Sequence, residues 1–429
     1  MNEQIKQRII QLNNGEAPDG YKKTEFGVFP CDWVTDKKLK DLGAFGKGKG
    51  LPGDKMTSEG VSCVGYGDIY MKYNHFHFEK AKTFVDEETA SESQPINKGT
   101  LLFTGTGETA EEIGKCVCYN GDETIYAGGD IITFVSNKVN PLFLAYQQYQ
   151  DFSLRKKASF GQGHSVVHIQ RDNLEKLNAA YPESTEEQSK IAEILMKWDE
   201  AIELQEKQIH QLNKRKKAVL QHIFSKEKPQ NTIVLGESVL LISSGGTPLT
   251  SNDEYFNGDI VWVSIDDISQ SDKYIYDSSR KLTDKGIKNS SAKIFPKGTI
   301  LYAMYASIGK CSIAGVDCAT SQAILGILPD PQKLDNQYLY YYLCSIQDMI
   351  ILQGQKGTQS NLNKKMVFDF RIPVPCKNND IDVEKQKAIA DVLAKIDEEI
   401  SLNNEKIEKI KKQRKILQKY LLNGIVRVN

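Results

Sequence analysis

The stretch 186–223, EEQSKIAEILMKWDEAIELQEKQIHQLNKRKKAVLQHI, decides the fold, because the chain repeats its helical pattern at 384–421, EKQKAIADVLAKIDEEISLNNEKIEKIKKQRKILQKYL. The two copies align without a gap, so that Gln188 matches Gln386 and Ile209 matches Ile407. Such a repeat determines how the rest of the chain is divided. At 1.5 Å per residue, each copy predicts a helix about 60 Å long.

Apolar residues in both copies recur at alternating steps of four and three, which is the heptad pattern of a coiled coil. Polar residues interrupt both copies at the same places, Gln205 with Asn403 and Lys216 with Arg414. Because a polar seam residue fixes register, Gln205 and Asn403 are predicted either to pair at the centre of the two helices or to face solvent. The predicted seam and partner interface is Ile191, Leu195, Trp198, Ile202, Gln205, Ile209, Leu212, Ile389, Leu393, Ile396, Ile400, Asn403, Ile407 and Ile410.

Basic residues cluster at equivalent positions of the two copies, in 214–217 and 412–415. Two interpretations stay open: a solvated face, or an interface with acidic partner helices or with the DNA backbone.

The rest of the sequence also repeats, because short strand-like runs separated by glycine occur in both halves. Residues 98–103 and 297–302 echo each other, as do 114–116 and 309–311. A tyrosine-rich helix is expected at 141–154 and again at 336–350, each followed by a loop rich in glycine and amides. The predicted divisions are an amphipathic helix at 1–19, a domain at 20–184, a helix at 185–226, a domain at 227–382, and a helix with its tail at 383–429.

This pattern predicts a mixed α+β fold in which two similar globular domains alternate with two long helices. Two like domains joined through two like helices imply pseudo-twofold symmetry and an antiparallel coiled coil. The domains share their order of elements but few residues, whereas the helices share both. Two different surfaces on similar frames indicate two different ligands.

Composition excludes several classes of protein. The 429 residues carry a net charge of −1, and no apolar run approaches the length of a membrane span. The amino terminus lacks the order of a signal peptide, so we expect a cytoplasmic protein. The eight cysteines show no Cys-x-x-Cys spacing; we expect reduced, mostly buried thiols and no metal site.

A catalytic site is not indicated either. Residues 105–110, GTGETA, superficially match a dinucleotide fingerprint. The required helix does not follow, because Ile113-Gly114 and a new strand come next. A base-flipping adenine methyltransferase needs a proline pair beside an aromatic residue, and none of the thirteen prolines is followed by another.

The chain resembles the specificity (S) subunit of type I restriction–modification systems. The resemblance covers nearly the whole chain and rests on GYKKTEFGVFP at 20–30 with Trp33, SGGTP at 244–248, GTQSNL at 357–362, and the duplicated Gln-x-x-Ile-Ala-x-x-Leu starts at Gln188 and Gln386. It implies that each domain is a target-recognition domain, that the helices are spacers, and that the subunit itself is not catalytic. Its implied partners are double-stranded DNA, two methyltransferase subunits and restriction subunits. S-adenosylmethionine, ATP and magnesium are then expected only in those partners.

A bipartite target follows from two domains held by a spacer. Half-sites read on one face of B-DNA lie about 34 Å apart, and four extra helical residues, about 6 Å, are expected to shift that spacing by one or two base pairs. Loop residues with groove chemistry are the candidate DNA contacts. They are Lys47, Lys49, Thr104, Thr106, Gln162, His164 and Ser165 in the first domain, and Ser244, Thr247, Tyr305, Ser307, Lys356, Thr358, Gln359 and Asn361 in the second.

Two rival interpretations remain at this level. One is a specificity polypeptide of a related system, of type IIB or IIG, in which modification and cleavage share a chain. The other is a duplicated coiled-coil scaffold that binds protein and has no salt-dependent affinity for DNA.

Overall fold

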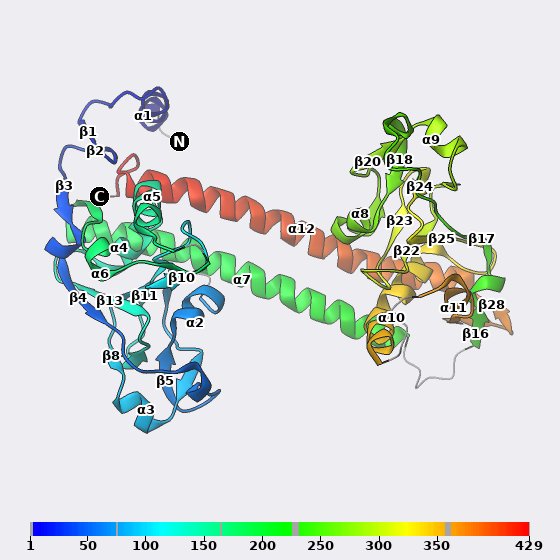
Figure 1. Ribbon diagram of the computed structural model, residues 1–429, viewed down its shortest axis with the longest axis horizontal. Helices are drawn as coiled ribbons and strands as arrows, with labels where there is room; N and C mark the ends of the chain where they lie inside the picture. The colour runs from blue at the N-terminus through cyan, green and yellow to red at the C-terminus, as the bar shows by residue number, and fades with distance from the viewer. Residues whose placement is uncertain (1–2, 74–75, 164, 225–230, 357–361, 429) are drawn as a thin grey trace. The chain divides into compact units, whose positions relative to one another are not determined.

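A computed structural model describes residues 3–73, 76–163, 165–224, 231–356 and 362–428, the side chains of 353–356 excepted. The chain divides into two compact units, unit 1 with residues 1–205 and 406–429, and unit 2 with residues 206–405. Each unit therefore combines one globular domain with one part of each long helix. These helices are α7 (Thr185–Ile223) and α12 (Val383–Leu422), drawn green and red in Figure 1.

Two sheets form the domain of unit 1. The larger has five strands in the order β4-β13-β9-β11-β6, and the smaller has four in the order β7-β5-β12-β8. The five are β4 (Gly43–Lys47), β13 (Ile131–Ser136), β9 (Thr100–Thr104), β11 (Cys116–Tyr119) and β6 (His77–Phe78); the four are β7 (Thr83–Val85), β5 (Val61–Val64), β12 (Ile125–Ala127) and β8 (Gln94–Ile96). Shorter pairs join β1 (Tyr21–Thr24) to β2 (Gly27–Pro30), β3 (Trp33–Lys38) to β15 (Asn178–Pro182), and β10 (Thr106–Gly107) to β14 (Val167–His168).

Unit 2 repeats the strand order of both larger sheets. Its five-stranded sheet has the order β17-β25-β22-β23-β19, and its four-stranded sheet the order β20-β18-β24-β21. The strands are β17 (Val239–Ser244), β25 (Ile324–Pro329), β22 (Ile300–Ala303), β23 (Cys311–Ala314), β19 (Tyr274–Ile275), β20 (Arg280–Leu282), β18 (Phe256–Val263), β24 (Cys318–Thr320) and β21 (Ile294–Phe295). Further pairs are β16 (Asn231–Val234) with β26 (Arg371–Val374), and β27 (Cys376–Lys377) with β28 (Asp380–Ile381).

Further helices complete both domains. Unit 1 contains α1 (Glu3–Asn13), α2 (Tyr66–Met71), α3 (Glu87–Ser91), α4 (Pro141–Gln147), α5 (Asp151–Phe160) and α6 (Arg171–Leu174). Unit 2 contains α8 (Ile265–Gln270), α9 (Asp284–Lys288), α10 (Asn336–Lys356) and α11 (Lys364–Phe368). In the part of the chain that the structure describes, no helix is both long and apolar enough to cross a membrane.

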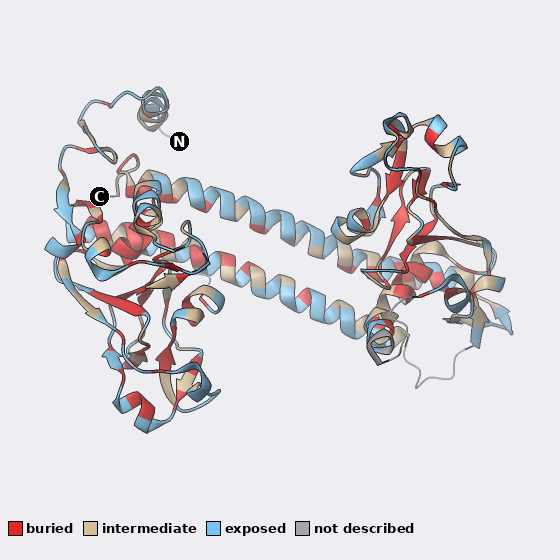
Figure 2. Cartoon of the chain, in the orientation of Figure 1, coloured by how far each residue is buried: buried red, intermediate tan, exposed pale blue. Residues whose placement is uncertain are grey.

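The central strands are buried on both faces, which explains their unbroken apolar sequences. In β9, Leu101 and Phe103 face the core that includes the start of α7, whereas Leu102 faces a second core with residues of the four-stranded sheet. In β22, Ile300 and Tyr302 face one core and Leu301 the other. Figure 2 shows this concentration of buried residues in the sheets, with exposed residues dominating the outer faces of the long helices.

Both long helices begin at equivalent caps and are anchored by equivalent glutamines. The Ser184 hydroxyl accepts from the backbone N–H of Glu187, and the Asp382 carboxylate accepts from that of Lys385. One turn later, the Gln188 amide donates to the carbonyl of Pro182 and accepts from the backbone of Asn140. Gln386 makes the corresponding bonds to Lys333 and Asp335, so each helix is fixed to the domain that precedes it.

The predicted single helix at 141–154 is wrong, because two helices, α4 and α5, occupy this stretch. The chain turns at 148–150, where the backbone N–H groups of Tyr149 and Gln150 bond to carbonyls three residues back. The turn lets two side chains reach backbone partners in the core. Gln147 bonds to the backbone of Ala180, and the Tyr149 hydroxyl donates to the carbonyl of Cys116 at 2.6 Å. The counterpart α10 continues without a break, beyond its predicted end at 350.

The seam residues face inward along both helices. Ile191, Leu195, Ile202, Leu212, Leu393, Ile396 and Ile407 are buried, and Trp198, Ile209, Ile389, Ile400 and Ile410 are half-buried. Gln205 is only 4 % exposed, so the solvent-facing interpretation is wrong for this residue. The Asn403 amide donates to the Glu399 carbonyl of its own helix at 2.7 Å. Pairing between Gln205 and Asn403 stays a prediction.

Candidate nucleic-acid interface

One end of the five-stranded sheet in unit 1 gathers most of the predicted site residues. Lys47 is opposite Ile132, Ile131 is opposite Thr104, and Cys116 is opposite Phe103. Four strand ends therefore meet at this end of the sheet: the end of β4, the start of β13, the end of β9 and the start of β11. Loops that leave these strands form a common surface there.

Backbone hydrogen bonds tie these loops together. The Gly105 N–H donates to Asp130 at 2.8 Å, and the carbonyl of Gly105 accepts from Ile169 at 3.0 Å. Gln162 and His168 exchange backbone bonds of 3.0 and 2.8 Å. Strand β10 pairs with β14, and the Thr106 hydroxyl lies 3.2 Å from Nδ1 of His168. The predicted residues Thr106 and Gln162 thus lie on neighbouring, mutually fixed loops.

Unit 2 builds a similar surface and repeats both backbone bonds of Gly105. Met304 replaces Gly105: its N–H donates to Ala323 at 3.0 Å, and its carbonyl accepts from Leu362 at 3.1 Å. The end of β17 joins them, since Ser244 is opposite Leu325 and the N–H of Gly245 donates to Ile324 at 3.0 Å. The two domains therefore present different side chains on one backbone frame.

Glycine lets the backbone pass closely beside this surface in both domains. A Cβ at Gly48 would lie 1.8 Å from the carbonyl oxygen of Gly128, and one at Gly246 would lie 2.3 Å from the carbonyl carbon of Ser291. Any larger residue would push the strand end away. Glycine in the Lys47-Gly48-Lys49 stretch is thus required by packing, and the two lysines project from it as exposed side chains.

A lysine that the sequence analysis did not select occupies the same position in both domains. The backbone carbonyl of Lys115 accepts from Thr104 at 3.0 Å, and that of Lys310 accepts from Ala303 at 2.9 Å. The Lys310 ammonium donates to the carbonyl of Ser269 in α8 at 2.7 Å, and the Lys115 ammonium donates to the carbonyl of Tyr70 in α2 at 3.4 Å. Partial burial lowers the pKa of Lys115. The echo of 114–116 in 309–311 was the signal that marked these lysines.

Thr104 is a correction to the predicted contacts. Its side chain is fully buried, and its hydroxyl lies 2.8 Å from that of Tyr70. Thr104 therefore supports Tyr70 and does not reach a ligand itself. The reason is that β9 is covered on both faces, so its last residue remains enclosed.

The other predicted contacts differ in exposure. Lys47, Lys49, Gln162, Ser165 and Tyr305 are exposed, whereas Thr106, Ser244, Thr247 and Ser307 are half-buried. The Ser307 hydroxyl lies 2.8 Å from that of Ser269, and the Thr247 hydroxyl accepts from the backbone of Gln322 at 3.5 Å. His164, Thr358, Gln359, Asn361 and the side chain of Lys356 lie outside the described residues.

The charges of the two surfaces differ. The loop between β10 and β11 carries three exposed carboxylates, Glu108, Glu111 and Glu112, whereas 304–309, MYASIG, carries no charged residue. Hydroxyl, amide and ammonium groups beside exposed backbone suit readout of base edges and phosphates. A carboxylate can accept a hydrogen bond from the amino group of cytosine. The two surfaces are therefore suited to different sequences.

A second arrangement that both units share joins the long helices within each unit. In unit 1, Asp199 of α7 pairs with Arg414 of α12 at 2.8 Å and accepts from the Tyr146 hydroxyl at 2.8 Å. In unit 2 the roles of the helices are exchanged: Asp397 of α12 pairs with Lys216 of α7 at 2.5 Å and accepts from Tyr341 at 2.7 Å. One member of each basic run thus turns inward, and the helices pair antiparallel in both units.

Comparison with known families gives two matches along the chain. A sequence profile described as "Type I restriction modification DNA specificity domain" matches residues 30–214 and 234–412. Each match covers one globular domain and most of the long helix that follows it.

Individual relatives agree with this result. The MjaX type I restriction enzyme specificity subunit of Methanocaldococcus jannaschii is 27 % identical over 439 aligned residues, which cover 96 % of this chain and 97 % of the relative. The EcoR124I/EcoR124II specificity subunit of Escherichia coli is 27 % identical over 183 residues, 41 % of this chain and 42 % of the relative.

Solved structures share the fold. The S subunit of the type I system of M. genitalium has a TM-score of 0.58 at 15 % identity, with coverage of 91 % of this chain and 96 % of that one. A chain from a study of complex assembly and conformational transition of the type I system has a TM-score of 0.59 at 16 % identity, with coverage of 93 % and 99 %.

Proposed function

Because the chain belongs to the family of type I restriction–modification DNA specificity proteins, we propose that each of its domains reads one half of a bipartite DNA target. The observation that carries the proposal is the repeated sheet end. Both domains build it with the same strand order and with equivalent backbone bonds at Gly105 and Met304, but fill it with different side chains. A shared frame with different surfaces is what a split target requires.

The long helices act in this proposal as the spacer and as the docking site for partner subunits. Each is continuous, over 39 residues in α7 and 40 in α12. Their duplicated sequence offers two equivalent docking surfaces, which supports the recruitment of two methyltransferase subunits, with restriction subunits joining for cleavage. The complex then acts on cellular DNA in the cytoplasm.

Catalysis belongs to the partner subunits in this scheme. Adenine methylation uses S-adenosylmethionine held by the methyltransferase subunits, and ATP and magnesium serve the restriction subunits. The contribution of this chain is recognition: it positions the duplex so that one adenine in each half-site reaches a methyltransferase subunit.

The test is to co-express the chain with its cognate methyltransferase subunit and to map methylated adenines in host DNA by single-molecule sequencing. The expected result is a split motif with methylated adenines on opposite strands. A methyltransferase that carries its own nuclease domain would identify the related type IIB or IIG arrangement. A stable complex without new methylation, and without salt-dependent DNA binding, would favour the scaffold interpretation.

A matched variant tests the spacer. One heptad inserted after Gln205 and another after Asn403 preserves the phase of the seam and lengthens both helices by about 10 Å. At about 3.4 Å per base pair, the gap between half-sites should grow by about three base pairs while both half-sites keep their sequences. An unchanged gap would contradict the role of the helices as a ruler.

A further inference from the structure

Two cysteines of unit 2 lie in direct contact. The Sγ atoms of Cys311, the first residue of β23, and Cys344 of α10 are 3.9 Å apart. Cys311 is buried, whereas Cys344 is half-buried. In unit 1 the corresponding strand residue is Cys116, and a phenol takes the place of the second thiol: Tyr149 bonds to the backbone of Cys116. The pair of thiols is therefore specific to the second domain.

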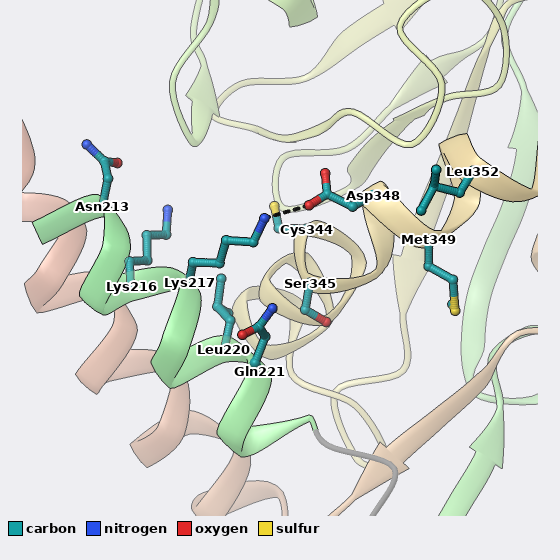
Figure 3. A pocket seen from close by; sticks show the side chains of 10 residues that line it. All are labelled: Asn213, Lys216, Lys217, Leu220, Gln221, Cys344, Ser345, Asp348, Met349 and Leu352. Carbon is teal, nitrogen blue, oxygen red and sulfur yellow. Dashed lines mark hydrogen bonds and ion pairs between the residues drawn. The ribbon is translucent and has the colours of Figure 1, made fainter. Parts of the chain in front are cut away.

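Cys344 is open to small solutes through a pocket of about 590 Å³ between α7 and α10. Figure 3 shows Cys344 among the lining side chains, with Lys216 and Lys217 of α7 and with Ser345 and Asp348 of α10. Lys217 pairs with Asp348 at 2.7 Å beside the pocket. A reagent that enters the pocket meets Cys344 first, because Cys311 is enclosed.

The surroundings give the two sulfurs different roles. The pKa of Cys344 is lowered, first because the Cys311 thiol donates a hydrogen bond to it and then because the Lys216 ammonium is close; together with a bond from Tyr340 these outweigh burial and the nearby Asp397. The pKa of Cys311 is raised because its proton is held in that bond and because it is buried. A thiolate attacks, whereas a thiol does not.

We propose that Cys344 and Cys311 form a site of oxidative modification for a small hydroperoxide, with Cys344 as the attacking sulfur and Cys311 as the resolving sulfur. The Cys344 thiolate attacks one peroxide oxygen, the O–O bond breaks, and the departing hydroxide takes from solvent a proton equivalent to the one that Cys344 released, to become water, which leaves a sulfenic acid. The Cys311 thiol then passes its proton to the sulfenic acid oxygen while its sulfur, gaining thiolate character, attacks the Cys344 sulfur. The S–O bond breaks, and the hydroxyl leaves with that proton as a second water. Two thiols lose two electrons, and hydrogen peroxide gains them.

Oxidation alters the candidate DNA surface of the second domain, a consequence that rests on the proposed function. The sulfurs must approach from 3.9 Å to about 2.05 Å. Cys311 directly follows the loop 304–310, which carries Tyr305, Ser307 and Lys310. Because the loop is continuous with the strand end that moves, its side chains shift on the DNA-facing surface.

The chemical test uses the full-length chain and hydrogen peroxide, followed by non-reducing peptide mapping. We expect a Cys311–Cys344 cross-link, and reaction of Cys344 about tenfold faster than that of the exposed Cys31. Cys311→Ser should stop the reaction at a sulfenic acid on Cys344 that dimedone traps, and Cys344→Ser should leave Cys311 unmodified. Cys376→Ser, which changes a half-buried cysteine elsewhere in unit 2, serves as the matched control and should cross-link normally.

Absence of the cross-link in folded, peroxide-treated protein, or labelling of Cys344 no faster than Cys31, would overturn the proposal. A separate arm uses the assembled methyltransferase complex and a duplex with its mapped target. Peroxide should weaken binding severalfold in the wild type, dithiothreitol should restore it, and Cys344→Ser should not respond. A disulfide without any change in DNA binding would refute the link to recognition, whereas failure of the unoxidised complex to bind would refute the proposed function instead.

Discussion

The two units join the long helices with the same three positions but with different degrees of burial. In unit 1, Tyr146, Asp199 and Arg414 form the junction, and the ion pair is almost closed to solvent, with side-chain exposures of 8 % and 3 %. In unit 2, the junction is Tyr341, Asp397 and Lys216, and both charged side chains are 23 % exposed.

This difference has a local origin. Arg414 bonds to both carboxylate oxygens of Asp199 and to Gln418, and it lies over the ring of Phe76 at 4.3 Å. Lys216 makes one ion pair beside an open pocket. A guanidinium has several planar donors, which can satisfy both oxygens of a buried carboxylate. An ammonium is sufficient where water supplies the remaining hydrogen bonds to the carboxylate. The duplication kept the position of the cation, and the environment of each unit matches its chemistry.

The largest effect is therefore expected at the buried junction. Arg414→Met leaves the Asp199 carboxylate buried without its cation and should destabilise unit 1 by about 3–5 kcal/mol. Lys216→Met should cost unit 2 about 1 kcal/mol, since water screens Asp397. Hydrogen exchange of amides in 195–203 and in 393–401 reports on the two units separately.

Lys415→Met is the matched control, because Lys415 is an exposed neighbour of Arg414 on α12. It should change the exchange rates little. Equal losses for Arg414→Met and Lys216→Met would show that burial does not distinguish the two junctions.

The next effect concerns the loop that precedes Lys115 in unit 1 and Lys310 in unit 2, and the side chain that holds this loop in each unit. Unit 1 uses Lys157, which is buried and donates to the carbonyl of Gly114 at 2.8 Å. Unit 2 uses an amide, Gln347, which donates to the carbonyl of Ile308 at 3.4 Å. Desolvation lowers the pKa of Lys157 to about 8. At this loop, unit 1 therefore carries the cost of a buried ammonium at neutral pH, whereas unit 2 has a neutral amide there.

The sign of the pH dependence follows from that shift. Between pH 8 and the unfolded pKa of about 10.4, the unfolded chain binds a proton at Lys157 that the folded chain has released, so this lysine alone makes stability rise with pH, by about 2–3 kcal/mol up to pH 10. The buried thiols of Cys63, Cys116 and Cys118 act in the opposite direction, because their pKa values are raised and unfolded thiols release protons at about pH 8.5. The contribution of Lys157 is therefore measured as a difference between variants. From pH 8 to pH 10, urea unfolding of unit 1 should show the wild type and Lys156→Gln, an exposed control, gaining about 2–3 kcal/mol relative to Lys157→Gln. The same change with pH in all three proteins would exclude this role of Lys157.

Most of the architecture could be predicted from the sequence, because it rests on repetition and periodicity. The seam from Ile191 to Leu212 and its copy from Ile389 to Ile410 are local patterns, and the strands echoed at 98–103 and 297–302 are short apolar runs. The break between α4 and α5 was missed, since it depends on where Gln147 and Tyr149 find backbone partners far away in sequence. No periodicity encodes those contacts.

The candidate site was less accessible to prediction. Lys216 and Arg414 were predicted as interruptions of the seam and as members of the two basic runs, but not as partners of aspartates, because Arg414 lies 215 residues from its partner Asp199. Thr104 was chosen for its hydroxyl, but burial of β9 on both faces removes it from solvent. Lys115 and Lys310 were visible as an echo, and only the sheet register places them beside the loops of the surface.

The smallest effect compares the two ends of one sheet. Lys47 and Lys49 lie at the loop-bearing end of the five-stranded sheet, whereas Lys138 follows Ser136 at the opposite end, where Ser136 is paired with Gly43. All three lysines are exposed, so they differ mainly in position. If DNA phosphates contact only the loop-bearing end of the sheet, then Lys47 and Lys49 contribute to binding and Lys138 does not.

Lys47→Ala and Lys49→Ala should each weaken DNA binding by about 0.5–1 kcal/mol and reduce the slope of log K against log salt by about one. Lys138→Ala should change neither. The measurement is a salt titration of the assembled methyltransferase complex on its mapped duplex. Because a phosphate contact carries no base information, the methylated motif should stay the same in all three variants. Loss of the motif would assign the lysines to base readout, and an effect of Lys138→Ala equal to theirs would place the DNA elsewhere on the domain.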